Sequence, residues 1–484
     1  MNLSRWFRGS AVIVLVFAVL LSSTLFIHKT LALSWEQVST SGFGDADNIT
    51  SLNLVSFNDK IYASSGNYGV VPTGVQIFSS ADGASWTQVN TSGFGSITNF
   101  EAVMTVFDSA LYVATDTMGA GMSELWKTTN GTDWTQVGQS GFGDANNVRV
   151  IGMEEYDGGL YIGVTNGVTG AEVWCLDSAG TLTQVNTDGF DGTVTINTIF
   201  SLQEYDGALY AGAGTDAAGA QVWKTVNGTT WSQVMQGGFG DINNGVVSTL
   251  FSFNDQLYAG TINATTGTEV WRTMTGDTVW EQVNTDGFGD ALTSWSGIQT
   301  AIINGTVYLG TRNNTNGARL FTSTNGSTWT QEGTTGFGDP TNNYAIYAIT
   351  FNGRIYLSIS SETGAEIWRT GEMGSLAIAE TSLDEGTVED AYVETLSTDH
   401  GTSPMSWSVT AGTLPDGVRL DEETGEFSGT PTRAESFTFT ITVTDSGVPQ
   451  QLASSEYTIK INEKVEVLPE TGASFTYRPF LNFF

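Results

Sequence analysis

Short apolar runs separated by turn residues recur along most of the chain. The first four runs, Leu52–Phe57, Ile61–Ser64, Val75–Ser79 and Ser85–Val89, are parted by Asn-Asp, Gly-rich and Asp-Gly sequences. Apolar runs of this length between such turns are typical of β-strands joined as hairpins. The pattern therefore predicts units of short antiparallel strands, four to a unit.

One phrase recurs in seven copies, spaced by roughly 49 residues, a period typical of repeat architectures. It consists of an aromatic residue or Leu, any residue, Gln-Val or Gln-Glu, and a Phe eight positions after its start. The copies begin at Trp35, Trp86, Trp134, Leu182, Trp231, Trp280 and Trp329. A second phrase in each unit has an apolar residue before Asn or Asp and a Tyr five positions later, as in Phe57 and Tyr62. A four-stranded unit of this length, repeated radially, predicts a β-propeller blade.

The two ends of the repeat region complement each other. The last unit, from Ala345 to Trp368, has three strands and no outer-strand phrase after it, whereas Ser34–Val38 has no strands before it. Pairing these ends would close the ring and remove exposed sheet edges. We therefore predict an all-β, seven-bladed propeller over residues 33–371, closed by an N-terminal strand. A β-solenoid is the alternative, but it would need shorter repeats and terminal caps.

Most of the 14 tryptophans occupy two positions of the repeat, the outer strand and the third strand. Large aromatic residues at equivalent places in successive blades fill the space between neighbouring sheets. We therefore interpret them as structural.

The turn before the outer strand reads Ser80-Ala81-Asp82-Gly83-Ala84-Ser85-Trp86 in the first unit and Thr129-Asn130-Gly131-Thr132-Asp133-Trp134 in the second. It resembles a shortened Asp-box, the turn of sialidase-like propellers, and it departs from that pattern at Ser178–Leu182 and Gly276–Trp280. In that family the turn is structural, so the resemblance implies the fold and not an activity.

A different all-β pattern follows the propeller, over residues 372–464. Leu414-Pro415-Asp416-Gly417-Val418, Thr424-Gly425-Glu426-Phe427-Ser428-Gly429-Thr430-Pro431 and the alternating run Phe437–Val443 resemble the immunoglobulin-like domains of bacterial surface proteins. The resemblance implies a β-sandwich. Members of this group are often classed with cadherin-like domains, which implies a Ca²⁺ site.

Four acidic residues supply the oxygen ligands that Ca²⁺ prefers. They are Asp384, Glu385, Asp421 and Asp445. The cadherin inter-domain motif is absent, so solvated loop acids are the alternative. A second acidic set recurs after the Gly-Phe-Gly turns at Asp45, Asp144, Asp241, Asp290 and Asp339, where we expect local turn hydrogen bonds instead of a metal. We expect Ca²⁺ to bind weakly if it binds, and the sequence indicates no other cofactor.

Both termini carry targeting patterns. Residues 1–32 have Arg5 and Arg8 before the apolar run Ala11–Ile27, which predicts a signal peptide; an uncleaved anchor is the alternative. The tail, residues 465–484, contains Leu468, Pro469, Glu470, Thr471 and Gly472, which match a sortase signal for attachment to a cell wall. The apolar span that normally follows such a signal is missing, so a chance match stays open.

The charge balance limits the kinds of partner that the chain is expected to bind. The chain carries 17 basic and 51 acidic residues, a formal net charge of −34, which disfavours nucleic acid and anionic lipid. Its single cysteine, Cys175, excludes an internal disulfide framework, so stability must come from buried apolar area. These features favour an exported, monomeric protein located outside the cell.

The propeller contains no residue set for known hydrolytic chemistry. The two histidines are His28 and His400, outside it, which excludes Ser/His/Asp and His-ligated zinc sites there. A sialidase mechanism needs a cluster of three arginines, whereas Arg272, Arg319 and Arg369 lie beside the third-strand aromatic residues of separate repeats. We predict no catalytic residue, although a pair of carboxylates could still hydrolyse a glycoside.

A binding site is predicted where the repeats lose their identity. The position that lies seven residues before the end of each first strand differs from unit to unit. It is occupied by Thr50, Phe100, Arg149, Thr198, Val246, Ser296 and Tyr344, and Trp295 is adjacent to Ser296. Aromatic and cationic side chains suit recognition of sugars or polypeptides. We therefore predict that Phe100, Arg149, Trp295 and Tyr344 bind an extracellular glycan or protein. The alternatives are a glycan-cleaving enzyme and a purely architectural surface protein, with first-strand ends that only fill the channel.

Overall fold

The computed structural model describes residues 35–68, 72–215, 217–276, 278–298, 300–371, 376–401, 404–446 and 450–464. The signal segment 1–32 and the motif Leu468–Gly472 lie outside these residues, so both stay predictions. Within the described residues no helix is long and apolar enough to cross a membrane. The regular structure there consists of β-strands and short 3-10 turns.

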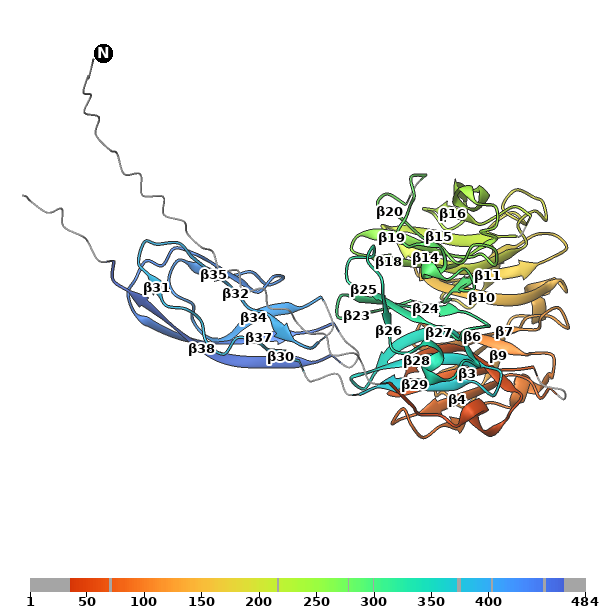
Figure 1. Ribbon diagram of the computed structural model, residues 1–484, viewed down its shortest axis with the longest axis horizontal. Helices are drawn as coiled ribbons and strands as arrows, with labels where there is room; N and C mark the ends of the chain where they lie inside the picture. The colour runs from red at the N-terminus through yellow and green to blue at the C-terminus, as the bar shows by residue number, and fades with distance from the viewer. Residues whose placement is uncertain are drawn as a thin grey trace, which may run out of the picture. The chain divides into compact units, whose positions relative to one another are not determined.

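Seven antiparallel four-stranded sheets form the repeat region, which confirms the predicted propeller (Figure 1). Each blade runs from an inner to an outer strand. In order, the blades are β2 (Asn48–Phe57), β3 (Lys60–Asn67), β4 (Gln76–Ser80), β5 (Thr87–Gln88); β6 (Glu101–Phe107), β7 (Ala110–Asp116), β8 (Leu125–Thr128), β9 (Thr135–Val137); β10 (Asn147–Tyr156), β11 (Gly159–Asn166), β12 (Glu172–Leu176), β13 (Leu182–Gln184); β14 (Thr198–Tyr205), β15 (Ala208–Gly214), β16 (Gln221–Thr225), β17 (Ser232–Met235); β18 (Val246–Phe253), β19 (Gln256–Ile262), β20 (Val270–Thr273), β21 (Glu281–Gln282); β22 (Trp295–Ser296) with β23 (Ala301–Ile303), β24 (Thr306–Arg312), β25 (Leu320–Ser323), β26 (Thr330–Glu332); and β27 (Asn342–Phe351), β28 (Arg354–Ser361), β29 (Glu366–Thr370), β1 (Trp35–Gln37).

The last blade takes its outer strand from the N-terminal segment, as predicted. β1 pairs antiparallel with β29, with Trp35 opposite Thr370, and the Val38 amide donates to the Ile367 carbonyl at 2.8 Å. The inner strand β2 contacts β27 and β28, so the beginning and the end of the repeat region lie side by side (Figure 1). Closure satisfies two sheet edges that would otherwise be unpaired.

Before six of the seven inner strands, the Gly-Phe phrase forms a tight 3-10 turn in which Gly and Phe both adopt left-handed backbone angles. The turns are η1 (Ser41–Gly44), η2 (Ser92–Gly95), η3 (Ser140–Gly143), η4 (Gly237–Gly240), η5 (Asp286–Gly289) and η6 (Thr335–Gly338). Phe239, for example, has φ 62° and stacks on Trp271 at 5.1 Å, with Trp280 edge-on at 5.4 Å. Equivalent aromatic clusters recur around the ring, so the repeated tryptophans are structural, as interpreted.

In most blades a buried hydrogen-bond network joins the Gly-Phe turn to the third strand. In the fifth blade Asn244 Nδ2 donates to the Gly238 carbonyl at 2.9 Å and to Glu269 Oε2 at 2.7 Å, and Trp271 Nε1 donates to the same oxygen. The sixth blade differs, because Arg319 takes the place of this glutamate and donates to the Gly287 carbonyl. The sequence predicted that Arg319 is equivalent to Arg272 and Arg369, and this prediction is wrong. Arg319 precedes its third-strand aromatic residue, Phe321, whereas the other two arginines follow theirs.

The turn before the outer strand is held by hydrogen bonds from its own backbone and side chains. Asp82 accepts hydrogen bonds from the amides of Ala84 and Ser85 and from two serine hydroxyls, and these bonds lower the pKa of its carboxyl well below the usual range. In the second blade Asn130 accepts the same two amide bonds. The following Gly131 lies against the Tyr62 hydroxyl of the first blade, where a Cβ would not fit. The turn before the outer strand of one blade thus meets the tyrosine of the second phrase in the preceding blade.

The C-terminal domain is a β-sandwich, as predicted. Its strands form a sheet of β31 (Gly386–Thr387), β38 (Leu452–Asn462), β37 (Ser436–Thr444) and β34 (Ser406–Gly412), a sheet of β32 (Tyr392–Thr395), β36 (Glu426–Gly429) and β35 (Val418–Leu420), and the pair β30 (Ala377–Ile378) and β33 (Thr398–Asp399). Alternate residues of β37 and β38 point into the core around Phe427 and Trp407.

Candidate functional site

The inner strands begin at one end of the central channel, and residues at or near the start of each strand form a ring there. We call this ring the channel mouth; its members are Thr50, Glu101, Arg149, Thr198, Val246, Trp295 and Tyr344. Each pairs with the end of the second strand in its own blade, as Glu101 lies opposite Asp116 and Trp295 opposite Arg312. Successive blades are joined here by backbone hydrogen bonds such as Asn67 N to Phe100 O at 2.8 Å.

The fixed offset of seven residues from the end of the first strand predicted the wrong ring residue in two blades. In the second blade the ring position belongs to Glu101 and not to Phe100, because β6 pairs with β7 without the β-bulge that lengthens most other inner strands. In the sixth blade it belongs to Trp295 and not to Ser296, because the inner strand is interrupted between β22 and β23. A bulge adds one residue to one strand, so a fixed count slips by one wherever a bulge is missing.

The predicted residues Arg149, Trp295 and Tyr344 come together around one aromatic cluster. The Arg149 guanidinium lies 5.2 Å from the centre of the Phe200 ring, and Phe200 meets Trp295 edge-on at 6.0 Å. Trp295 in turn meets Tyr344 at 5.7 Å. Arg312, which was not among the predicted site residues, covers Trp295 at 4.9 Å and Tyr344 at 5.9 Å.

Burial separates these side chains into two groups. Tyr344 is 6% exposed and belongs with Ile151, Phe200 and Tyr347 to an apolar plug that fills the channel below its mouth. Trp295, Arg149 and Arg312 are half-buried and reach solvent. Tyr344 therefore supports the others from beneath and has little surface to offer a ligand. Phe100 stacks on Tyr68 at 5.9 Å, beside the ring.

A buried charged cluster connects the first three blades at the mouth. Glu101, 4% exposed, is hydrogen-bonded to Tyr68 and Thr50, and Asp116 forms an ion pair with Arg149 at 2.5 Å. Burial, reinforced by repulsion from Asp116, raises the pKa of Glu101 to about 7. Burial also raises the pKa of Asp116, although Arg149 opposes the shift.

Space for Glu101 is provided by a glycine in the preceding blade. A Cβ at Gly66 would lie 2.7 Å from Glu101 Cγ, closer than packed carbon atoms approach. The sequence signal for this cluster was an acidic residue at the start of an inner strand, opposite a second acid at the end of β7. It was missed because the counted position fell one residue short.

The predicted Ca²⁺ ligands of the C-terminal domain lie in three segments of the chain, at Asp384–Glu385, Asp421 and Asp445, and each segment makes its own hydrogen bonds. Glu385 accepts from Asn462 Nδ2 at 2.7 Å, Asp421 accepts from the Glu423 and Thr424 amides, and Asp445 accepts from the Gln451 amide. The Asp384 carbonyl accepts from the Tyr392 hydroxyl. Across the part of the chain that the structure describes, no three His, Cys, Asp or Glu side chains gather as a metal site.

The repeated aspartates after the Gly-Phe-Gly turns make local bonds, as expected. Asp45 Oδ1 accepts from the Asp47 amide at 3.0 Å, and its other oxygen faces Asn67 Nδ2. Asp241 has an equivalent role, and hydrogen bonds led by the Asn243 amide lower the pKa of its carboxyl.

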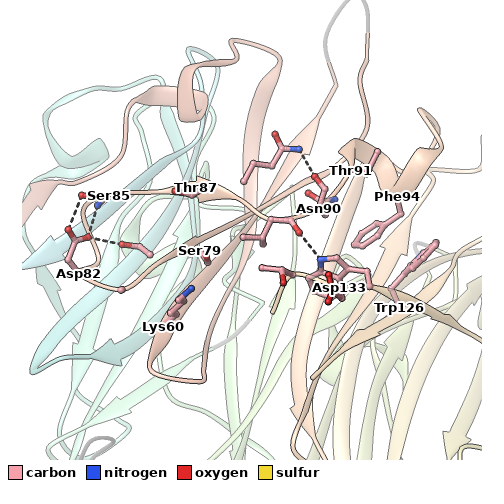
Figure 2. Close-up of a pocket in the computed structure, with 16 residues that line it drawn as sticks. Lys60, Ser79, Asp82, Ser85, Thr87, Asn90, Thr91, Phe94, Trp126 and Asp133 are labelled. Carbon is pink, nitrogen blue, oxygen red and sulfur yellow. Dashed lines mark hydrogen bonds between the residues drawn. The ribbon is translucent and has the colours of Figure 1, made fainter. Parts of the chain in front are cut away.

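A wide groove runs between the outer parts of the first and second blades, with a volume of about 1130 Å³ (Figure 2). Phe94 and Trp126 form one wall, and Trp134 Nε1 donates to the Val89 carbonyl at 2.9 Å. Figure 2 shows Asp82 held by its turn at the far side, with Lys60 nearby. A similar groove of about 540 Å³ lies between the fifth and sixth blades. Both are lined by repeat residues, which identifies them as consequences of blade packing.

Comparison with known families agrees with this architecture. Residues 31–244 match the family described as "DUF6242 beta propeller domain", and residues 375–462 match the one described as "Putative Ig domain". The chain joins a β-propeller to an immunoglobulin-like domain. None of the curated proteins matches it.

Solved structures show the same fold. The extracellular domain of BT4673 from B. thetaiotaomicron, named in one structure as a hybrid two-component and in another as a one-component system, is 14% and 13% identical to this chain. The TM-scores are 0.52 and 0.51; each alignment covers 88% of this chain and 47% or 48% of that one. The chain thus spans about half the length of these structures, and at such identity the likeness concerns the fold alone.

Proposed function

We propose that the protein is exported to the cell surface, where its propeller binds an extracellular glycan or protein at the channel mouth without catalysing its breakdown. The signal-like segment 1–32 and the extracellular nature of the BT4673 domain support the location. The binding role rests on one observation, the half-buried Trp295 and Arg312 that reach solvent from a rigid aromatic cluster.

This cluster has the properties of a recognition surface. Trp295 is held by Phe200 and Tyr344 through edge contacts, so its ring loses little entropy when a ligand packs on it. Arg312 donates through Nε to Asn314 Oδ1 at 3.0 Å. Its guanidinium has further donors, which suit a hydroxyl, carboxylate or carbonyl group on the ligand.

The carboxylates at the mouth are poorly placed for glycoside hydrolysis. Glu101 and Asp116 are 4% and 1% exposed, and Arg149 already pairs with Asp116. A hydrolase must bring both carboxylates to the scissile bond. This geometry supports recognition over turnover.

The test is a screen of the mature chain from Leu33 against glycans and surface proteins, with hydrolysis assayed on each hit. Trp295→Ala should weaken binding at least tenfold, because aromatic contacts at the centre of an interface contribute most of its energy. Trp280→Ala, which removes a tryptophan packed on Phe239 away from the mouth, is the matched control. Binding unaffected by Trp295→Ala would place the site elsewhere, and release of product would restore the enzyme hypothesis.

A further inference from the structure

A second cavity lies in the central channel, on the other side of the apolar plug. Its volume is about 140 Å³, and residues from all seven blades contribute to its wall. The residues that matter here are Asn53, Thr105, Glu154, Ser201, Gln203 and Tyr347. The cavity is too small for a drug-sized molecule, but it can accept the end of one side chain.

One buried polar atom in this cavity, Asn53 Oδ1, lacks a hydrogen-bond partner. Asn53 is 2% exposed, and its Oδ1 has no hydrogen-bond partner, although its side chain is hydrogen-bonded to Tyr347. A buried carbonyl oxygen without a donor costs free energy that a ligand can recover. Asn53 Oδ1 can therefore accept a hydrogen bond from a donor on a ligand.

Glu154 adds negative charge to the same wall. One of its oxygens accepts from the Glu204 amide at 3.2 Å. Burial, and after it the nearby Glu204 and Glu155 carboxylates, raises its pKa to about 7. None of the described residues that line the cavity is basic. A cation that entered would meet a carboxylate and a free carbonyl oxygen.

The surface around this end of the channel is also acidic. Two clefts of about 630 and 610 Å³ lie at the first-to-second-strand turns of the third, fourth and fifth blades. The first contains Glu155, Asp157 and Glu204, and the second contains Glu204, Asp206 and Asp255. All five side chains are exposed, and neither cleft has a described lysine or arginine in its lining. Such a field attracts cations over distances up to the Debye length.

From this arrangement we propose that the channel end opposite the Gly-Phe-Gly turns binds a basic polypeptide segment, with one lysine ammonium inserted between Glu154 and Asn53 and further basic residues in the acidic clefts. This site lies on the other face of the propeller from the channel mouth and is independent of the proposed function. An ammonium has three donors, which can satisfy Glu154, Asn53 Oδ1 and a hydroxyl of the wall.

Calorimetry on the mature chain from Leu33 tests the proposal. The probe is the peptide acetyl-(Gly-Lys)₃-amide, with acetyl-(Gly-Gln)₃-amide as the uncharged reference and n-butylammonium as a competitor for the cavity. We expect saturable binding of the lysine peptide alone, and competition by n-butylammonium. Glu154→Gln, which retains the acceptor for the Glu204 amide, should weaken binding about tenfold, as the loss of a desolvated charge contact does.

The matched control is Glu362→Gln, the same charge change at an exposed residue of the second-to-third-strand loop in the last blade. It should bind like the unaltered chain, and so should Trp295→Ala, which separates this site from the channel mouth. Asn53→Leu provides a second test of the cavity, and melting curves establish that each variant is folded. Equal binding of both peptides, unchanged affinity in Glu154→Gln, or no competition by n-butylammonium would each overturn the proposal.

Discussion

The phenylalanine of each Gly-Phe turn occupies a backbone conformation that bulky residues avoid. All seven have φ between 54° and 67°. A left-handed residue of this kind costs roughly 1 to 2 kcal/mol. Stacking of each ring in an interblade aromatic cluster offsets that cost, because burying a Phe side chain contributes about 2 kcal/mol or more. A strained backbone is therefore retained where it positions a ring.

We expect Phe239→Ala to lower the free energy of unfolding by about 3 kcal/mol, as buried Phe-to-Ala changes do. The Ala side chain keeps the left-handed strain and loses the contacts with Trp271 and Trp280. Denaturant unfolding followed by tryptophan fluorescence measures the change. Phe239→Leu, which keeps an apolar side chain, should lose less than half as much. Equal losses in the two variants would mean that stability depends on the aromatic ring itself and not on burial of an apolar side chain.

A buried acid makes stability depend on pH. Since the pKa of Glu101 rises from 4.5 to about 7 in the folded chain, the folded state binds this proton more tightly than the unfolded state does. The contribution of Glu101 to the free energy of unfolding is complete below about pH 4.5 and is lost as the pH rises through about 7. Glu154 acts in the same direction. We expect a melting temperature several degrees higher at pH 5.5 than at pH 8.

Glu101→Gln should reduce this pH dependence, because the amide cannot ionise, while the contribution of Glu154 remains. The control is Glu362→Gln, which changes an exposed carboxylate of the loop after β28 and should leave the pH dependence of the melting temperature unchanged. Thermal unfolding between pH 5.5 and 8 gives both slopes. A slope in Glu101→Gln equal to that of the unaltered chain would contradict the assignment.

At the scale of the element, register decides which side chains share a site. The inner strands of most blades contain a bulge, whereas β6 pairs evenly with β7 along its whole length. This one-residue difference exchanges Phe100 for Glu101 at the channel mouth and brings a carboxylate beside Tyr68 and Arg149. The chemistry of the site thus depends on an irregularity that hydrophobic alternation does not reveal.

The closing strand β1 provides a prediction at this scale. A chain lacking residues 34–38 should melt about 10 °C lower, because it loses the hydrogen bonds to β29 and the contact of Trp35 with Phe337 at 5.6 Å. Two exposed edges should also favour association, visible by size-exclusion chromatography. As a control, Glu36→Gln removes only an exposed ion pair with Arg369 and should shift melting little. An unchanged melting temperature after the deletion would refute closure.

For the whole molecule, the termini predict where the protein resides. We expect the mature chain to begin near Leu33 and to be recovered outside the cell. N-terminal sequencing after fractionation checks both points, and a cytoplasmic protein that retains residues 1–32 would contradict them. If the motif Leu468–Gly472 anchors the chain, Thr471→Ala should shift it from the wall fraction to the medium. If the unaltered chain and Thr471→Ala divide in the same way between the wall fraction and the medium, the motif is inactive.

The sequence alone determined the architecture, the closure and the structural role of the aromatic residues. These follow from seven copies of one phrase at fixed offsets, because each copy must satisfy the same local geometry and pack against its neighbours. It also selected Arg149, Trp295 and Tyr344, which the structure brings to the same cluster.

Only the tertiary structure decided what that cluster is. The ion pair between Asp116 and Arg149, the position of Glu101, the cover that Arg312 provides and the burial of Tyr344 depend on which strand ends meet at the channel. The unpartnered oxygen of Asn53 and the carboxylate of Glu154 line one cavity only because all seven blades converge on the channel. Local pattern specifies each strand, whereas ring closure and bulges place residues from distant blades within contact distance.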